Sequence, residues 1–327
     1  MRVFAGILLF AGLFHFSGVN ACTAFYIKTK NAVLIGNNED GSNPETRIWV
    51  EPAGEGRYGR LYFGFSDLSP QGGINEKGLW FDAFGLPFET PSEIKGEVYP
   101  GDLQDKILAE CSTVEEVAAL LKRYNRSQMN RYQWMIGDKN GNSAIVEDDT
   151  ILFSNQNLQV VTNFRQSNFP DGKGYECLRY QTAMKILKSD ACGSVDDVRK
   201  ILSATHSEGE DVTLYSYIAD LTHGKVYVYN FHNYEDVVIL DINEEINKGK
   251  HVYSIHDLFP LTVAAEVFNY RLQNDLNQKI ESRRFKNFDN STLVNYCGRY
   301  QITSPAVMAG QTLHLTTEKE YIKPPVK

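Results

Sequence analysis

The sequence predicts an α+β fold built mainly from antiparallel strands. Short runs that alternate apolar and polar residues are joined by turn-forming residues, as at 22–36 and again at 73–87. The chain also holds 18 Tyr, 18 Phe and 3 Trp, residue types that favour strands and can line an apolar pocket. Helical patterns are fewer and fall at 101–124, 176–187, 194–204 and 261–282. Together these observations are typical of antiparallel sheets covered by helices.

The first 21 residues have the pattern of a secretory signal peptide. Arg2 provides a short positive region, and an apolar run at 7–16 is too short to span a bilayer. Val19 and Ala21 fit the small-residue rule for the positions before a cleavage site. We therefore expect a secreted or periplasmic protein whose first residue after cleavage is Cys22. No stop-transfer pattern follows, which argues against a membrane anchor.

A cysteine directly after such a segment permits two interpretations. With a free α-amine it carries a nucleophile and a base on one residue. It could instead be a lipid attachment site, which would block both groups, although Asn20 is an unusual residue before such a site.

Composition sets broad limits on function. Hydrophobic residues make up 42% and charged residues 23%, as in an ordinary globular chain of one large domain, with or without a small appendage. The net charge of −8 disfavours nucleic acid and anionic membranes as partners. No zinc-binding spacing occurs, so we expect no metal or other cofactor. The sequence leaves open whether the chain forms a homo-oligomer.

Five cysteines fit one free residue for chemistry with four others that could pair. The four are Cys111, Cys177, Cys192 and Cys297. Buried unpaired thiols explain them equally well, and their pairing is left open.

The first predicted hairpin places polar residues beside the nucleophile. The strand that starts at Cys22 returns along 32–36 and leads into the polar run 37–41. In a hairpin of this length, Asn37 and Asp40 come near the Cys22 amine and thiol. A carboxylate there can hold the ammonium or thiol in place.

Short elements in this order resemble the choloylglycine hydrolase and penicillin V acylase family. The opening elements are Cys-Thr-Ala-Phe at 22–25 and Gly-Asn-Asn-Glu-Asp at 36–40, with Asn37 where the family usually has arginine. The Asn-Glu-Lys-Gly-Leu run at 75–79 is similar to a further family element. The family's members are linear amide hydrolases of the N-terminal nucleophile (Ntn) superfamily. The resemblance implies a four-layer αββα sandwich of two antiparallel sheets flanked by helices, with a small C-terminal β appendage.

The resemblance also implies the oxyanion hole and the cation near the nucleophile. Gly85 falls where a family residue donates its backbone N–H to the oxyanion, and Asn163 falls where a Thr-Asn supplies a side-chain amide. Arg179 matches an arginine near the nucleophile, and a fixed cation favours thiolate over thiol. Three aromatic residues are candidates for the wall of the acyl pocket, although single aromatics are more often core: Trp80, Phe84 and Trp134.

We therefore expect a signal peptide at 1–21, a catalytic domain at 22–282, and a linker with a small β segment at 283–327. Within the β segment, alternating runs at 293–300 and 311–316 predict strands. The predicted activity is hydrolysis of a small-molecule linear amide through a Cys22 thioester, without a membrane partner after cleavage. Two alternatives stay open. One is a secreted or lipid-anchored binding protein that does no catalysis, and the other is a papain-like protease, for which the scattered histidines supply no motif.

Overall fold

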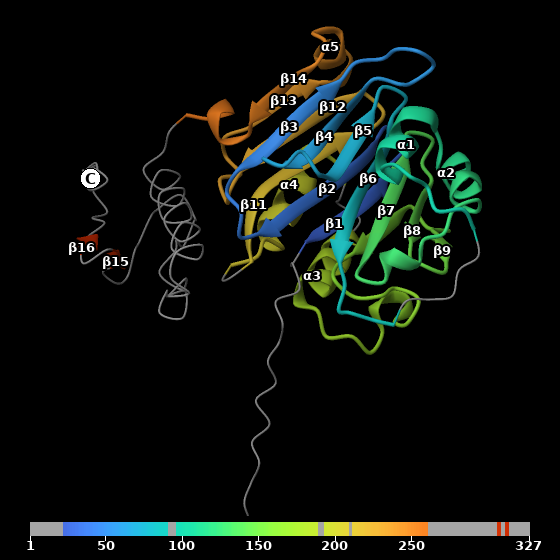
Figure 1. Ribbon diagram of the computed structural model, residues 1–327. Coiled ribbons are helices and arrows are strands. Elements are labelled where there is room, and N and C mark those ends of the chain that lie inside the picture. Colours follow the sequence, from blue (N-terminus) through green and yellow to red (C-terminus); the bar gives the residue numbers. More distant parts are fainter. Residues whose placement is uncertain are drawn as a thin grey trace, which may run out of the picture.

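Two antiparallel sheets form the centre of the molecule in the computed structural model (Figure 1), which describes residues 22–90, 96–188, 193–208, 211–260, 306–308 and 311–313. The six-stranded sheet has the order β10 (Leu158–Val161), β1 (Thr23–Lys28), β2 (Val33–Gly41), β11 (Val212–Asp220), β12 (Lys225–Asn230), β13 (Val238–Asp241). The eight-stranded sheet has the order β14 (His251–Ser254), β3 (Thr46–Glu51), β4 (Arg60–Phe65), β5 (Pro70–Asn75), β6 (Leu79–Gly85), β7 (Tyr132–Asp138), β8 (Ser143–Val146), β9 (Ile151–Phe153).

Helices cover the outer faces of both sheets. The eight-stranded sheet packs against α1 (Leu103–Glu110) and α2 (Val114–Leu121), and the six-stranded sheet against α3 (Leu178–Leu187) and α4 (Val195–Ala204) (Figure 1). The short helix α5 (Ile242–Asn247) follows β13, and 3₁₀ turns occur at Ser127–Met129, Pro170–Gly172 and His256–Leu258. The predicted αββα sandwich is confirmed, with one hydrophobic layer between the sheets and one under each helix layer.

The alternation of side chains in β6 connects two of these layers. Trp80 and Phe84 point into the layer between the sheets, whereas Leu79 and Phe81 point toward α1 and α2. This is the period of two expected for a strand buried on both faces. Trp134 of β7 packs edge-on against Phe81 and therefore belongs to the helix-covered layer.

The hairpin of β1 and β2 forms as the sequence predicts. Thr29 closes the turn, since its backbone N–H donates to the carbonyl of Ala32 at 2.8 Å and its hydroxyl accepts from the Ala32 N–H at 2.9 Å. Gly36 is required further along, because a Cβ there would lie 2.4 Å from the Phe25 ring. In the resulting register Thr23 lies opposite Asn38.

The helices at 101–124 are also confirmed, with caps of the predicted kind. The side chain of Thr113 accepts a hydrogen bond from the Glu116 N–H at the start of α2. The expected long helix at 261–282 and the strand at 293–300 lie outside the described residues. Within the expected strand at 311–316, β16 (Gln311–Leu313) pairs with β15 (Ala306–Met308). Among the described helices, none has the length and apolar character needed to cross a bilayer.

Candidate active site

Cys22 lies at the start of β1 with its thiol turned into the protein. The residue is 2% exposed, and its Sγ donates to Glu39 Oε1 at 3.7 Å and to the backbone carbonyl of Asp40 at 3.8 Å. Both partners come from β2, the second strand of the hairpin. The hairpin thus brings the Asn37–Asp40 segment to the thiol, as the spacing predicts.

Arg179, on the first turn of α3, links the predicted residues into one network. Its Nη1 donates to the Cys22 carbonyl at 2.8 Å and to the Thr23 hydroxyl at 2.6 Å. The same nitrogen lies 3.6 Å from Asp40 Oδ2, and Nη2 donates to Asn163 Oδ1 at 3.1 Å. The guanidinium therefore holds the Cys22 backbone, the Asp40 carboxyl group and the Asn163 amide at fixed separations.

Asn163 follows β10, and hydrogen bonds at its amide oxygen and its amide nitrogen together fix the orientation of the side-chain amide. Because Oδ1 accepts from Arg179, Nδ2 faces the other way and donates to the carbonyl of Gly85 at 3.0 Å. An amide nitrogen carries two N–H groups, so one remains for a further acceptor.

Gly85 presents its own N–H on the same side. The adjacent Leu86 N–H bonds the Arg131 carbonyl, so Gly85 and Tyr132 form the non-hydrogen-bonded pair of the β6–β7 ladder. In such a pair both backbone groups point away from the partner strand. The Gly85 N–H and the Asn163 amide are therefore available on one side of β6, as an oxyanion hole requires.

Burial and charge determine the protonation of the Cys22 thiol. Burial raises the pKa of the Cys22 thiol well above its usual value, and the carboxyl groups of Glu39 and Asp40 raise it further. Burial also raises the pKa of Asp40, although Arg179 and the Thr213 hydroxyl that donates to it act in the opposite direction. The thiol therefore rests protonated, and an attack on a carbonyl needs a base to take its proton.

A pocket of about 370 Å³ opens beside the thiol. Its lining residues are Cys22, Glu39, Ser69, Pro70, Gln71, Ala83, Phe84, Gly85, Gln104, Arg131 and Tyr132. Of the three aromatics expected in the wall, only Phe84 is present.

The other two aromatics require a correction. Trp80 is fully buried between the sheets, where its Nε1 donates to the Tyr217 hydroxyl at 2.8 Å. Trp134 lies on the opposite face of the eight-stranded sheet. The physical reason is the strand pleat, because residues 80, 82 and 84 share the inner face but only the last of them reaches the open end of β6.

Sequence reasoning missed Glu39. The register pairs Thr23 with Asn38, so the next residue, Glu39, lies opposite Cys22. The signal was available as a charged residue that continues the inward-facing series of Val33, Ile35 and Asn37 along β2. Asn37, expected near the thiol, is fully buried two residues away on that face.

Among the described residues, the other cysteines and the histidines make no hydrogen bond with the Cys22 thiol and do not line its pocket. Cys111 and Cys177 are free thiols, and Cys192 and Cys297 lie outside the described residues. The fold brings together two histidines that the sequence scatters, since the rings of His206 and His232 lie 4.4 Å apart. With Glu208 they form a group whose ligand atoms lie within 4.8 Å of one another, a spacing that could hold a metal ion.

A comparison with known protein families finds a match over the part of the chain that contains most of these residues. Residues 62–183 match the family of linear amide C-N hydrolases, choloylglycine hydrolase family. The match includes Gly85, Asn163 and Arg179, while Cys22 and Asp40 precede it. The predicted resemblance is confirmed, and with it the enzyme class, a hydrolase that acts on carbon–nitrogen bonds other than peptide bonds in linear amides.

Solved structures support the same fold. A variant of the conjugated bile acid hydrolase from Clostridium perfringens superposes with a TM-score of 0.57 at 19% identity, over 74% of this chain and 97% of that one. Penicillin V acylase from Agrobacterium tumefaciens gives a TM-score of 0.54 at 19% identity, over 71% of this chain and 90% of that one. A search of curated protein sequences found no significant match.

Proposed function

We propose that this chain is an exported amidohydrolase in which signal-peptide removal makes Cys22 the first residue and a single-residue nucleophile and base. It cleaves a linear, non-peptide amide of a small molecule through a thioester on Cys22. One observation carries this proposal: the Arg179 guanidinium joins the Cys22 carbonyl, Asp40 and Asn163 in one network.

The acylation step follows from this arrangement. The α-amine of Cys22, with an ordinary pKa of about 7.7–8.0, takes the thiol proton as the sulfur attacks the amide carbonyl. Asp40 orients the amine. The second N–H of Asn163 and the N–H of Gly85 stabilise the developing oxyanion, an effect worth about 3–4 kcal/mol for one donor.

The tetrahedral intermediate then collapses to products. The protonated α-amine gives its proton to the leaving amine, the carbon–nitrogen bond breaks, and the acyl group stays on Cys22 as a thioester. A water molecule repeats the sequence: it loses a proton to the α-amine, attacks the thioester carbonyl, and releases the acid and the thiol.

The burial of the sulfur supports catalysis over lipid attachment. A lipid on Cys22 Sγ would have to occupy the position where the sulfur contacts Glu39 and the Asp40 backbone, in a site that is 2% exposed. Such a chain needs more space than a pocket of about 370 Å³ lined by Gln71, Gln104 and other polar groups offers. A non-catalytic, lipid-anchored binding protein therefore suits this geometry less well.

The two related structures indicate different acyl groups. One is of a conjugated bile acid hydrolase and the other of a penicillin V acylase. The present chain has Asn37 where the resembling family usually has arginine, and this argues against assigning either of those substrates. The proposal is therefore limited to a linear amide.

The first test is the mass of the mature N-terminus. A chain that begins with an unmodified Cys22 supports the proposal, and one that begins elsewhere or carries a lipid refutes it. The second is a covalent acyl adduct on Cys22 after brief incubation with an activated amide and acid quenching. Cys22→Ala should abolish both the adduct and turnover, by roughly 10⁴-fold or more.

Single His→Ala variants separate this proposal from a papain-like mechanism. No histidine is among the residues that line the pocket beside Cys22. We expect His206→Ala and His232→Ala to keep substantial turnover whenever they fold. Complete loss in a folded His variant would favour a Cys–His pair instead.

A further inference from the structure

A buried carboxyl group lies next to the nucleophile without a partner for one of its oxygens. Glu39 is 3% exposed and lines the pocket. Its Oε1 accepts from the Cys22 thiol at 3.7 Å, while its Oε2 has no hydrogen-bond partner among the described residues. Buried polar groups are nearly always paired, so an unpaired oxygen at a pocket wall indicates an absent ligand or solvent.

The sheet that faces Glu39 contributes a second buried carboxyl group. Asp82 Oδ2 accepts from the Tyr217 hydroxyl at 2.6 Å, and that hydroxyl in turn accepts from Trp80. Asp82 Oδ1 and the hydroxyl of Tyr215 have no hydrogen-bond partner in the described part of the chain. Glu39, Asp82 and Tyr215 thus form a polar cluster within the layer between the sheets; we call it the inner acidic cluster.

The carboxyl groups of the inner acidic cluster are not balanced by nearby positive charge. Burial raises the pKa of Glu39 well above its usual range, and the charges of Asp82 and Asp40 raise it further. Arg179 pairs with Asp40 on the other side of Cys22. Arg131 lines the pocket too, but it is exposed, and its guanidinium stacks on Phe88 at 4.8 Å. Among the lining residues, no lysine, arginine or histidine side chain forms an ion pair with Glu39.

We propose that Glu39 is a specificity-determining residue and that the substrate's acyl group carries a protonated amine a few bonds from the scissile carbonyl. The carbonyl carbon binds to Cys22 Sγ, so an ammonium two to four bonds along the acyl chain reaches the Glu39 carboxyl group 3.7 Å from that sulfur, and the positive charge favours the ionised form of that group. A purely apolar acyl chain would leave Oε2 of Glu39 buried against hydrocarbon, which is unfavourable. This inference rests on the proposed function and adds its substrate class, an aminoacyl amide.

The test compares two substrates of equal length with the same leaving group. The 7-amino-4-methylcoumarin amides of 4-aminobutanoic acid and of pentanoic acid differ by an ammonium in place of a methyl group. In the wild-type protein we expect kcat/KM to favour the aminobutanoyl amide by at least about tenfold, as one charge-assisted hydrogen bond provides. Glu39→Leu should reverse that preference, and Glu39→Gln should reduce it.

The ratio of the two rates within one variant is independent of how much enzyme is active. Glu45→Gln is the matched control, because it removes an exposed carboxylate six residues away and should keep the wild-type ratio. A wild-type preference for the pentanoyl amide, or an unchanged ratio in Glu39→Leu, overturns the inference while leaving amide hydrolysis by Cys22 intact.

A binding measurement covers the case in which neither coumarin amide is cleaved. We expect 4-aminobutanamide to raise the Tm of the Cys22→Ala variant more than pentanamide does. Adding Glu39→Leu should remove this difference. Equal shifts from both amides would overturn the inference, whereas failure of the proposed hydrolysis would be shown separately by the missing acyl adduct on Cys22.

Discussion

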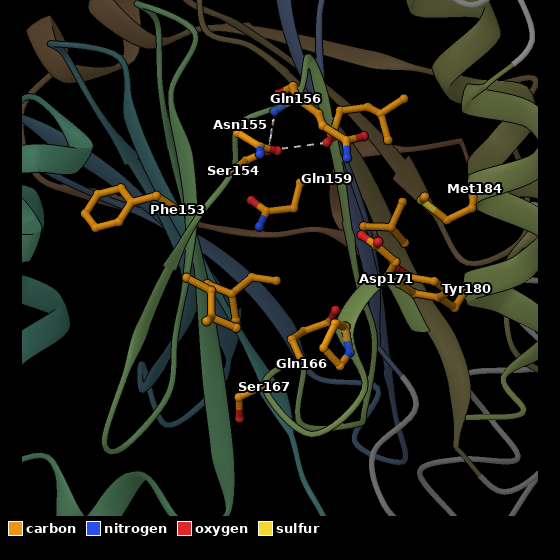
Figure 2. A pocket seen from close by; sticks show the side chains of 15 residues that line it. Phe153, Ser154, Asn155, Gln156, Gln159, Gln166, Ser167, Asp171, Tyr180 and Met184 are labelled. Atoms are coloured by element: carbon orange, nitrogen blue, oxygen red, sulfur yellow. Dashed lines mark hydrogen bonds between the residues drawn. The ribbon is translucent and has the colours of Figure 1, made fainter. Parts of the chain in front are cut away.

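Two pockets of similar size differ in the chemistry that lines them. The pocket beside Cys22 has about 370 Å³ and the second has about 300 Å³. The second pocket lies between β8, β9, β10 and α3, and Figure 2 shows its walls of neutral amides and apolar side chains, such as Gln159, Gln166 and Met184. Its charged member is Asp171, at the rim beside Tyr180. A pocket of this size does not by itself indicate a site; what distinguishes the first pocket is the Cys22 thiol beside buried, partly unpaired carboxyl groups.

The energetic difference between the pockets has a simple cause. In the second pocket Gln159 Oε1 accepts from the Ser143 hydroxyl at 2.7 Å, and among the described residues the unpaired buried group in the wall is a neutral amide nitrogen, Gln166 Nε2. Beside Cys22, in contrast, Glu39 and Asp82 keep unpaired oxygens in a buried layer. Such groups destabilise the fold unless a ligand pairs with them, which is typical of functional sites.

The largest expected effect is on kcat, and it comes from comparing two asparagine substitutions, one beside each pocket. Asn163→Ala removes a proposed oxyanion donor and should lower kcat by about 10²–10³-fold with little change in KM. Asn155→Ala removes an exposed asparagine from the wall of the second pocket and should leave kcat unchanged. Steady-state kinetics of both variants decide the matter, and equal effects would remove the distinction between the pockets.

The next effect tests the network around Arg179. Arg179→Lys keeps the charge but cannot reach Cys22, Asp40 and Asn163 at the same time. We expect kcat to fall by roughly 10–100-fold through misplacement of the reacting groups, with the protein still folded. Circular dichroism tests whether the variant is folded, and steady-state kinetics measure its kcat. Wild-type kcat in the folded variant would show that the guanidinium network positions nothing that the reaction needs.

A smaller effect appears in the pH dependence of stability. The folded protein raises the pKa of Glu39 through burial and the nearby Asp82, so the native state binds a proton that the unfolded state releases above about pH 4.3. Stability should therefore decrease as the pH rises from that value through the raised pKa. Glu39→Gln should increase Tm by a few degrees at pH 8 and by less at pH 5.

Thermal unfolding at the two pH values gives the measurement. Glu45→Gln is again the control and should shift Tm equally at both, since its side chain is exposed. A pH-independent effect of Glu39→Gln would mean that this carboxyl group is charged in the native state.

The smallest effect lies in the second pocket. Gln159→Ala breaks the hydrogen bond from Ser143 and should lower the free energy of unfolding by about 1 kcal/mol. Turnover should stay at the wild-type level. Denaturant unfolding and kinetics of the same preparation test this, and a loss of activity without a loss of stability would assign the second pocket a functional part.

The sequence by itself determined the local parts of this protein. The turn at Thr29, the glycine at 36 and the alternation of 22–28 define the hairpin, and its register follows from the turn length, so the approach of the 37–40 segment to Cys22 was predictable. The helices of 101–124 were predictable for the same reason, because caps and apolar periodicity act over a few residues.

Only the tertiary structure decided which side chains meet across the two sheets. Asp82 lies opposite Tyr217, Trp80 lies behind the pocket, and Trp134 faces the helices, and none of these positions follows from residues nearby in the chain. The physical reason is that sheet packing joins residues more than a hundred positions apart. The periodicity of a strand predicts which face of the sheet a side chain lies on, but it does not predict which residue of the other sheet that side chain contacts.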